Sequence, residues 1–159
     1  AGINAAGGNT SYAGALNAFV SSVGPLQVGG TGYTLETAGR LGYRARAVNL
    51  TAETKPHYMP GGTTVTLRAV VEEGTGRLLG VQAHGLEGVA WRINVCAAAI
   101  HGGMTIYDLA DAELAYYPPV SQMVDPLSQL ADIAIKRLKL PPRICREVFF
   151  PVPGAGHEG

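Results

Sequence analysis

The clearest pattern of hydrophobic and polar positions lies at residues 63–85, TTVTLRAVVEEGTGRLLGVQAHG. Two runs rich in β-branched residues alternate there with polar ones, on either side of EGTG, whose glycines can take the positive φ angles of a tight turn. Such alternation predicts two half-buried strands joined as an antiparallel hairpin. Residues 43–52, YRARAVNLTA, alternate in the same way and predict another strand.

One short helix is predicted before these strands and a longer one after the hairpin. Residues 35–42, LETAGRLG, follow Thr34 as a candidate N-cap and end on a glycine. Residues 88–103 predict the longer helix, which ends at a glycine pair. The face that this helix is expected to bury consists of Val89, Ile93, Cys96, Ala97 and Ile100.

Two further helices are predicted towards the end of the chain. Thr105 as N-cap, with Asp108 three residues later, marks the start of a short one. The segment DPLSQLADIAIKRL marks the other, with Asp125 as its cap and Pro126 at its first position. Between the two helices, LAYY at residues 114–117 is expected to form a strand.

The first 33 residues, which are rich in small side chains, carry weaker signals. Residues 1–9 predict the end of a helix, and residues 11–24 leave strand and irregular structure open. Gly29, Gly30 and Gly32 predict a turn before the first capped helix. The order of elements then predicts an α+β fold with a mostly antiparallel sheet and helices packed on one face.

Length and charge narrow the classes of function. A chain of 159 residues suits one domain. Its formal net charge is zero and only 15% of its residues are charged, so we expect no nucleic-acid partner and a surface that is partly covered in an oligomer. No apolar run is long enough to span a bilayer, and the start of the sequence has no methionine and no basic flank before an apolar core, so it does not resemble a secretory signal. We therefore expect no membrane partner, a cytoplasmic protein, and a start that lies within a longer polypeptide.

The motifs of most enzyme classes do not occur in the sequence. There is no G-x-S-x-G elbow or Walker loop, and GGTGYTL carries two glycines of a dinucleotide fingerprint without the third. The four histidines have no ligand spacing, which predicts no metal site. Cys96 and Cys145 form no C-x-x-C pair, and Cys96 is expected to be a small buried residue.

Tyrosines on loops remain as candidate functional groups. Tyr58 lies in KPHYMPGG, while Tyr116 and Tyr117 precede two prolines, which hold the chain extended and present the phenols. A phenol with a pKa of about 10 can donate a hydrogen bond to an anion at neutral pH. Packing at an interface suits tyrosine equally, so residue chemistry leaves both uses open.

Four longer segments follow one another along the chain: GYTLETAGRLG, KPHYMPGG, the run from GTGRLLGVQAHG to LAYYPP, and DPLSQLADIAIKRL. Together they resemble the C-terminal dimerisation domain of flavin-dependent pyridine nucleotide-disulfide oxidoreductases. The branch is that of coenzyme A-disulfide reductase, NADH oxidase and NADH peroxidase. The resemblance covers about residues 1–138, and its most specific pieces are G-[RK]-[LI]-L-G-x-Q, R-I-x-V, G-M-T-[IV]-x-D-L and L-A-Y-x-P-P.

The resemblance implies a homodimer in which each subunit completes the active site of the other. FAD and NAD(P)H would be bound by upstream domains of the same polypeptide, so we expect no cofactor and no activity in this chain alone. The catalytic residues implied are Tyr58 and Tyr116, near the partner subunit's redox cysteine and flavin. Pro118, Pro119 and Ser121 would line the approach to the cofactor.

The same resemblance implies a division of the chain. Residues 1–33 would connect a missing flavin-binding domain to this one and supply the first strand, residues 34–138 would form the dimerisation domain, and residues 139–159 would be a Pro-rich tail or linker. Met59 and Tyr117 depart from the family pattern, which often has Y-Y-P-G and A-Y-A-P-P at these places. The alternative is a free-standing dimeric binding or scaffold protein with the same fold and no redox role.

Overall fold

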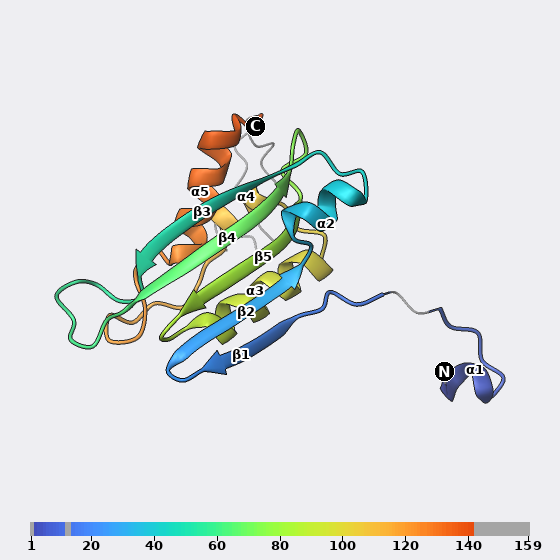
Figure 1. Ribbon diagram of the computed structural model, residues 1–159, viewed down its shortest axis with the longest axis horizontal. Helices are drawn as coiled ribbons and strands as arrows, with labels where there is room; N and C mark the ends of the chain where they lie inside the picture. Colours follow the sequence, from blue (N-terminus) through green and yellow to red (C-terminus); the bar gives the residue numbers. More distant parts are fainter. Residues whose placement is uncertain (1, 12–13, 142–159) are drawn as a thin grey trace, which may run out of the picture.

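Five strands form one sheet in the order β1-β2-β5-β4-β3, and every neighbouring pair is antiparallel (Figure 1). The computed structural model describes residues 2–11 and 14–141, so Cys145 and most of the predicted tail lie outside the described residues. The strands are β1 Phe19–Val23, β2 Leu26–Gly32, β3 Ala45–Glu53, β4 Thr64–Glu72 and β5 Leu78–Gly85. The helices are α1 Gly2–Ala5, α2 Leu35–Arg40, α3 Val89–His101, α4 Ile106–Ala110 and α5 Pro126–Leu138.

The predicted hairpin is β4 and β5, in which Leu67 pairs with Ala83. A bulge lies in this pair, because Val71 is opposite Leu78 whereas Val70 is opposite Gly80. Leu79 is the extra residue, and it turns to the face of the sheet opposite Leu78. Leu78 and Leu79 therefore pack on opposite faces of the sheet.

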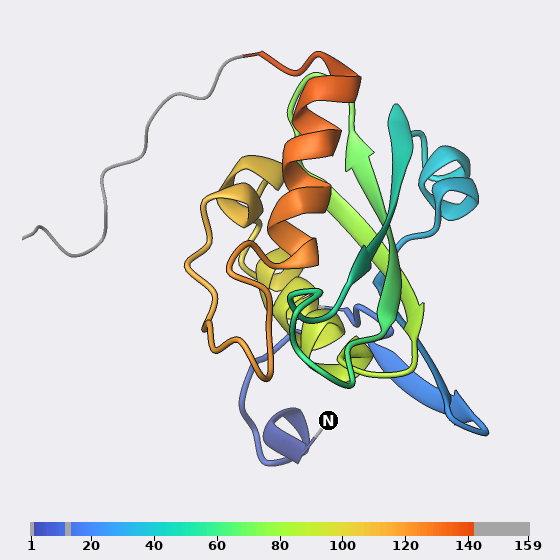
Figure 2. The same cartoon turned by 90° about the vertical axis from the view of Figure 1, so that its left-hand side faces the viewer.

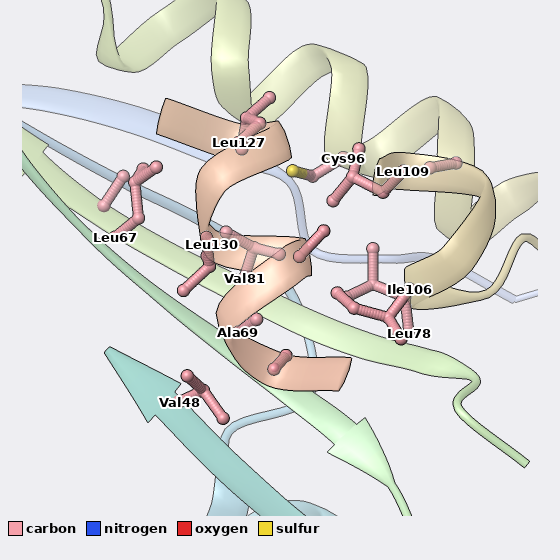
Figure 3. Packing of buried hydrophobic residues seen from close by; sticks show 14 of the residues in the cluster. Val48, Leu67, Ala69, Leu78, Val81, Cys96, Ile106, Leu109, Leu127 and Leu130 are labelled. Carbon is pink, nitrogen blue, oxygen red and sulfur yellow. The ribbon is translucent and has the colours of Figure 1, made fainter. Parts of the chain in front are cut away.

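The helices α3, α4 and α5 lie on one face of the sheet, and the short α2 lies on the other (Figure 2). The main core fills the space on the first face, where side chains such as Leu67 and Val81 meet Leu127 and Leu130 of α5 (Figure 3). Ala38 of α2 packs on the opposite face in a smaller cluster. The predicted α+β fold is confirmed, with this second layer as an addition to it.

The predicted helix starts are confirmed by their hydrogen bonds. Thr34 Oγ1 accepts a hydrogen bond from the Thr37 N–H at 3.1 Å. Thr105 and Asp108 form a reciprocal capping box at the start of α4. The carboxylate of Asp125 accepts a hydrogen bond from the Leu127 N–H at 2.8 Å.

The prediction of a turn at Gly29, Gly30 and Gly32 is wrong, because all three lie in strand β2. Close approach of other chain segments explains the glycines: a Cβ at Gly29 would lie 2.9 Å from the Phe19 carbonyl oxygen, and one at Gly32 would collide with the Leu79 carbonyl. The glycines therefore let β2 lie against its neighbours. For residues 11–24, strand and irregular structure were both open. Part of this segment is strand β1, which pairs with β2 across a tight turn.

The buried face of α3 differs in part from the expected one. Val89, Ile93 and Cys96 are buried as predicted, while Ala97 and Ile100 are only half-buried. Ala99 is also buried, and so is Arg92, with 1% of its surface exposed. Hydrophobic periodicity cannot identify a buried arginine, because the pattern assigns every charge to the solvent side.

Candidate functional site

Three connections meet at one end of the sheet and carry the tyrosines singled out from the sequence. The Tyr58 loop, residues 54–63, joins β3 to β4, and the Tyr116 loop, residues 111–125, joins α4 to α5. Residues 86–88 join β5 to α3 at the same end. The Tyr58 loop and the Tyr116 loop lie next to each other in both views of the molecule (Figures 1 and 2).

The Tyr58 loop is closed at its base by a buried threonine. The Thr54 N–H donates to the Thr63 carbonyl at 2.8 Å, and the Thr63 N–H donates to Thr54 Oγ1 at 3.2 Å. The Thr54 hydroxyl also donates to the Glu87 carboxylate, which lies 3.5 Å from Lys55 Nζ. These bonds fix both ends of the loop and leave Tyr58 at its tip, 64% exposed.

The Tyr116 loop is organised by Ser121 and contains no strand. Ser121 Oγ donates to the Ala115 carbonyl and accepts from the Tyr117 N–H, both at 3.1 Å. The predicted strand at residues 114–117 is therefore wrong: the prolines that follow remove ladder donors, and the serine takes the backbone groups that a neighbouring strand would use. Tyr116 is presented to solvent with 47% of its surface exposed.

Tyr58 and Tyr116 lie on neighbouring loops although 57 residues separate them in the chain (Figures 1 and 2). Partial desolvation, then a side-chain hydrogen bond with Tyr58 and the charge on Tyr58 when it is ionised, raise the pKa of Tyr116 above its ordinary value. Tyr116 is therefore a neutral phenol at physiological pH. Two adjacent phenols can donate hydrogen bonds to an anion that approaches from outside the chain.

A shallow apolar hollow lies beside the tyrosines. It has a volume of about 350 Å³ and is bounded by α3 and the Tyr116 loop; its lining residues are Trp91, Val95, Leu114, Ala115, Val120 and Ser121. Trp91 is held by the guanidinium of Arg92, whose Cζ lies 4.3 Å from the centre of the indole ring. Trp91 and Arg92 were not predicted from the sequence to lie at this end of the molecule. The signal that could have indicated them is an aromatic residue next to an arginine near the start of a helix.

The other residues predicted for the site lie in the same loop. Pro118 and Pro119 are half-buried in the turn that follows Tyr117. Ser121 is buried, with 6% of its surface exposed, and its hydroxyl is engaged by the backbone of its own loop. The structure thus brings all five predicted residues to one end of the molecule, and their roles toward a cofactor or substrate stay predictions.

The three glycines of GGTGYTL lie inside strand β2. Gly29, Gly30 and Gly32 approach other parts of this chain, so a phosphate has no space against them. Within the described residues, no group of three His, Cys, Asp or Glu side chains is arranged to hold a metal ion. None of the helices described is long and apolar enough to cross a membrane.

Comparison with known protein families shows to which family this chain belongs. Residues 20–127 match the family described as pyridine nucleotide-disulphide oxidoreductase, dimerisation domain. The chain belongs to this family. The match extends from β1 to the start of α5 and includes the whole of the Tyr58 and Tyr116 loops.

Relatives of the dimerisation domain are parts of much longer proteins. The CoA-dependent NAD(P)H sulfur oxidoreductase of Pyrococcus furiosus is 42% identical over 133 residues, which are 84% of this chain and 30% of that protein. An NADH oxidase of Methanocaldococcus jannaschii is 36% identical over 87% of this chain and 31% of its own length. An NAD-dependent persulfide reductase from A. fulgidus has the same fold, with a TM-score of 0.81 and 32% identity over 87% of this chain and 26% of that one.

These relatives confirm the resemblance drawn from the sequence motifs, including its branch, because coenzyme A disulfide reductases also match. This chain spans about 30% of the length of the curated relatives that it matches. The family is that of a dimerisation domain, which indicates association with another chain.

Proposed function

We propose that this dimerisation domain forms a homodimer within a larger FAD-dependent NAD(P)H:disulfide oxidoreductase of the coenzyme A-disulfide reductase or NADH oxidase type. In that dimer, Tyr58 and Tyr116 reach the active site of the partner subunit. The observation that carries this proposal is that two neighbouring loops present Tyr58 and Tyr116, both exposed, at the same end of the domain (Figures 1 and 2).

The end that carries the tyrosines has the composition of an interface. We call it the tyrosine surface and define it by its exposed large side chains: Tyr58, Leu86, Trp91, Tyr116, Tyr117, Val120, Met123 and Val124. Tyr, Trp and Met are enriched in protein interfaces, whereas isolated monomers seldom expose so many large apolar groups together. Lys55 and Glu87 at its edge are already paired with each other. A second copy of the domain would therefore bury this surface at little cost in desolvated charge.

The chemistry proposed for the tyrosines is hydrogen bonding to a charged reactant. A neutral phenol donates to a thiolate or a reduced oxygen species and so stabilises negative charge that develops there. FAD and NAD(P)H would supply the transfer of hydride and electrons when bound to the upstream part of the polypeptide. Because both cofactors are expected to be bound upstream, the domain alone is expected to bind no flavin and to have no activity.

Sedimentation velocity of the 159-residue chain tests the dimer. We expect a homodimer without flavin absorbance, and Met123→Asp should weaken it about a hundredfold, since a buried charge without a partner costs several kcal/mol. The matched control is Met104→Asp, because Met104 is also exposed but precedes α4, at the opposite end of α3.

Two outcomes would contradict the proposal. If the wild-type chain stays monomeric at high concentration, the proposed dimer does not form. If Met123→Asp and Met104→Asp weaken the dimer equally, the tyrosine surface is not its interface. A full-length polypeptide that forms the dimer but binds no flavin and has no redox activity would favour the free-standing scaffold protein instead.

A further inference from the structure

The two tyrosine loops are tied together by the side-chain amide of Gln122. Its Nε2 donates to the Lys55 carbonyl at 2.8 Å and lies 3.4 Å from the Glu53 carbonyl. Glu53 is the last residue of β3 and Lys55 the second residue of the Tyr58 loop, so the amide contacts the point where that loop leaves the sheet. Gln122 is half-buried, which protects these bonds from exchange with water.

Each partner of this contact is rigidly connected to one tyrosine. On one side, Gln122 follows Ser121, whose hydroxyl organises the backbone around Tyr116. On the other side, Lys55 belongs to the base of the Tyr58 loop and makes an ion pair with Glu87. The bond between Gln122 and Lys55 therefore limits how far the two loops can move apart.

Few other bonds could do this. Between residues 45–63 and residues 112–125, the hydrogen bonds of the described structure are the two made by Gln122 Nε2. Without the amide, the tyrosine contact alone would have to hold two exposed loop tips together. Exposed side chains gain little from such a contact, because they lose conformational freedom when they are ordered.

We propose that Gln122 is a positioning residue that holds the Tyr116 loop against the Tyr58 loop and keeps the two phenols in contact. Its effect on turnover rests on the proposed function of the tyrosines, whereas its effect on the tyrosine pair concerns this chain alone. Displacement of a catalytic group by about 1 Å can lower a rate about a hundredfold. A residue that touches no reactant can therefore have a large effect.

The first test measures the tyrosine pair in the isolated chain. Tyrosine labelled with ¹³C at Cζ is titrated by NMR in the wild type, in Gln122→Met and in the control Gln129→Met. Gln129 is matched because its Nε2 also donates to a backbone carbonyl, that of Val124, at 2.8 Å, but it does not join the two loops. Met keeps the length of the side chain and removes the donor.

The expected result is a pKa of Tyr116 that falls toward about 10 in Gln122→Met, because separation of the loops removes both the desolvation and the contact with Tyr58. The control should leave the wild-type titration unchanged. A Tyr116 pKa that is the same in Gln122→Met and the wild type would overturn the positioning role.

The second test uses the full-length enzyme and a double-mutant cycle. Gln122→Met should lower kcat about tenfold or more without loss of the dimer. In a background of Tyr58→Phe and Tyr116→Phe, the same change should have no further effect. An equal loss in both backgrounds would mean that Gln122 acts by another route. Wild-type turnover in the double phenylalanine variant would instead refute the role of the tyrosines, and the titration would still decide the role of Gln122.

Discussion

Arg92 and Asp125 form a buried bidentate ion pair that joins the start of α3 to the start of α5. Arg92 Nη2 lies 2.7 Å from Asp125 Oδ2, and Arg92 Nε donates to Asp125 Oδ1 at 3.1 Å. The remaining guanidinium nitrogen, Nη1, donates to the Gly88 carbonyl at 3.1 Å. Because Asp125 is also the N-cap of α5, one carboxylate orders the helix start and the last residue of the Tyr116 loop.

Loss of the arginine should therefore destabilise the whole domain. We expect Arg92→Met to lower the free energy of unfolding by about 3 to 5 kcal/mol, because it leaves the Asp125 carboxylate buried without its partner. Urea denaturation followed by circular dichroism measures the change. Glu73→Gln is the control, since Glu73 pairs with the exposed Arg44 and should change stability by about 0.5 kcal/mol or less. A loss below about 1 kcal/mol in Arg92→Met would contradict this account.

Gly80 should not tolerate a side chain. A Cβ at this position would lie 2.6 Å from the Tyr33 backbone N and would collide with the Tyr33 carbonyl oxygen, where the chain leaves β2. Gly80→Ala is thus expected to cost about 3 kcal/mol of stability in thermal or urea unfolding.

The matched change at Gly39 should act in the opposite direction. Gly39 lies in helix α2, and a Cβ there would meet no atom within 4 Å. Gly39→Ala is expected to stabilise the domain by about 0.5 to 1 kcal/mol, through the lower entropy of the unfolded chain. Equal effects of the two substitutions would show that the approach of Gly80 to Tyr33 does not constrain the fold.

Cys96 should make stability fall at high pH. Burial, with a further contribution from the negative charge of Asp125, raises the pKa of its thiol from 9.0 to about 12. Between these values the unfolded chain has released the proton that the folded chain still holds, so the free energy of unfolding decreases as pH rises. The slope expected from this group is about 1.4 kcal/mol per pH unit. It is measured as the difference between the wild type and Cys96→Ala in urea titrations from pH 8 to 11; identical slopes would contradict it.

Tyr116→Phe tests the role of the phenol in the full-length enzyme. We expect turnover to fall by about a hundredfold if the hydroxyl hydrogen-bonds to a developing charge, while the dimer and the FAD content stay as in the wild type. Steady-state kinetics, sedimentation and the flavin spectrum measure the three quantities. Tyr117→Phe is the control for loss of a hydroxyl at a neighbouring exposed position. Loss of the dimer in Tyr116→Phe would assign this tyrosine to packing.

The sequence predicts local elements well where local chemistry sets them. The caps at Thr34, Thr105 and Asp125 depend on a hydroxyl or a carboxylate next to its own helix, so their positions could be read directly. Alternation along 63–85 depends on one buried face, and it predicted β4 and β5. The motifs from GYTLETAGRLG to LAYYPP likewise predicted the family.

Predictions failed where other contacts replaced the preference of a short segment, whether these contacts came from distant strands or from a side chain in the same loop. Gly29, Gly30 and Gly32 form a strand because neighbouring segments need room for their backbones, and no local signal reports that need. Residues 114–117 have the composition of a strand, yet Ser121 takes the backbone groups that a ladder would use.

By itself, the sequence determined the α+β class, the helix starts, the hairpin and the candidate tyrosines, because hydrogen-bonding chemistry and hydrophobic period act over a few residues. Only the tertiary structure decided that Tyr58 meets Tyr116, that Gln122 bridges their loops, and that Arg92 is buried against Asp125. These contacts join residues more than 30 positions apart, and their geometry depends on how the sheet and its helices pack.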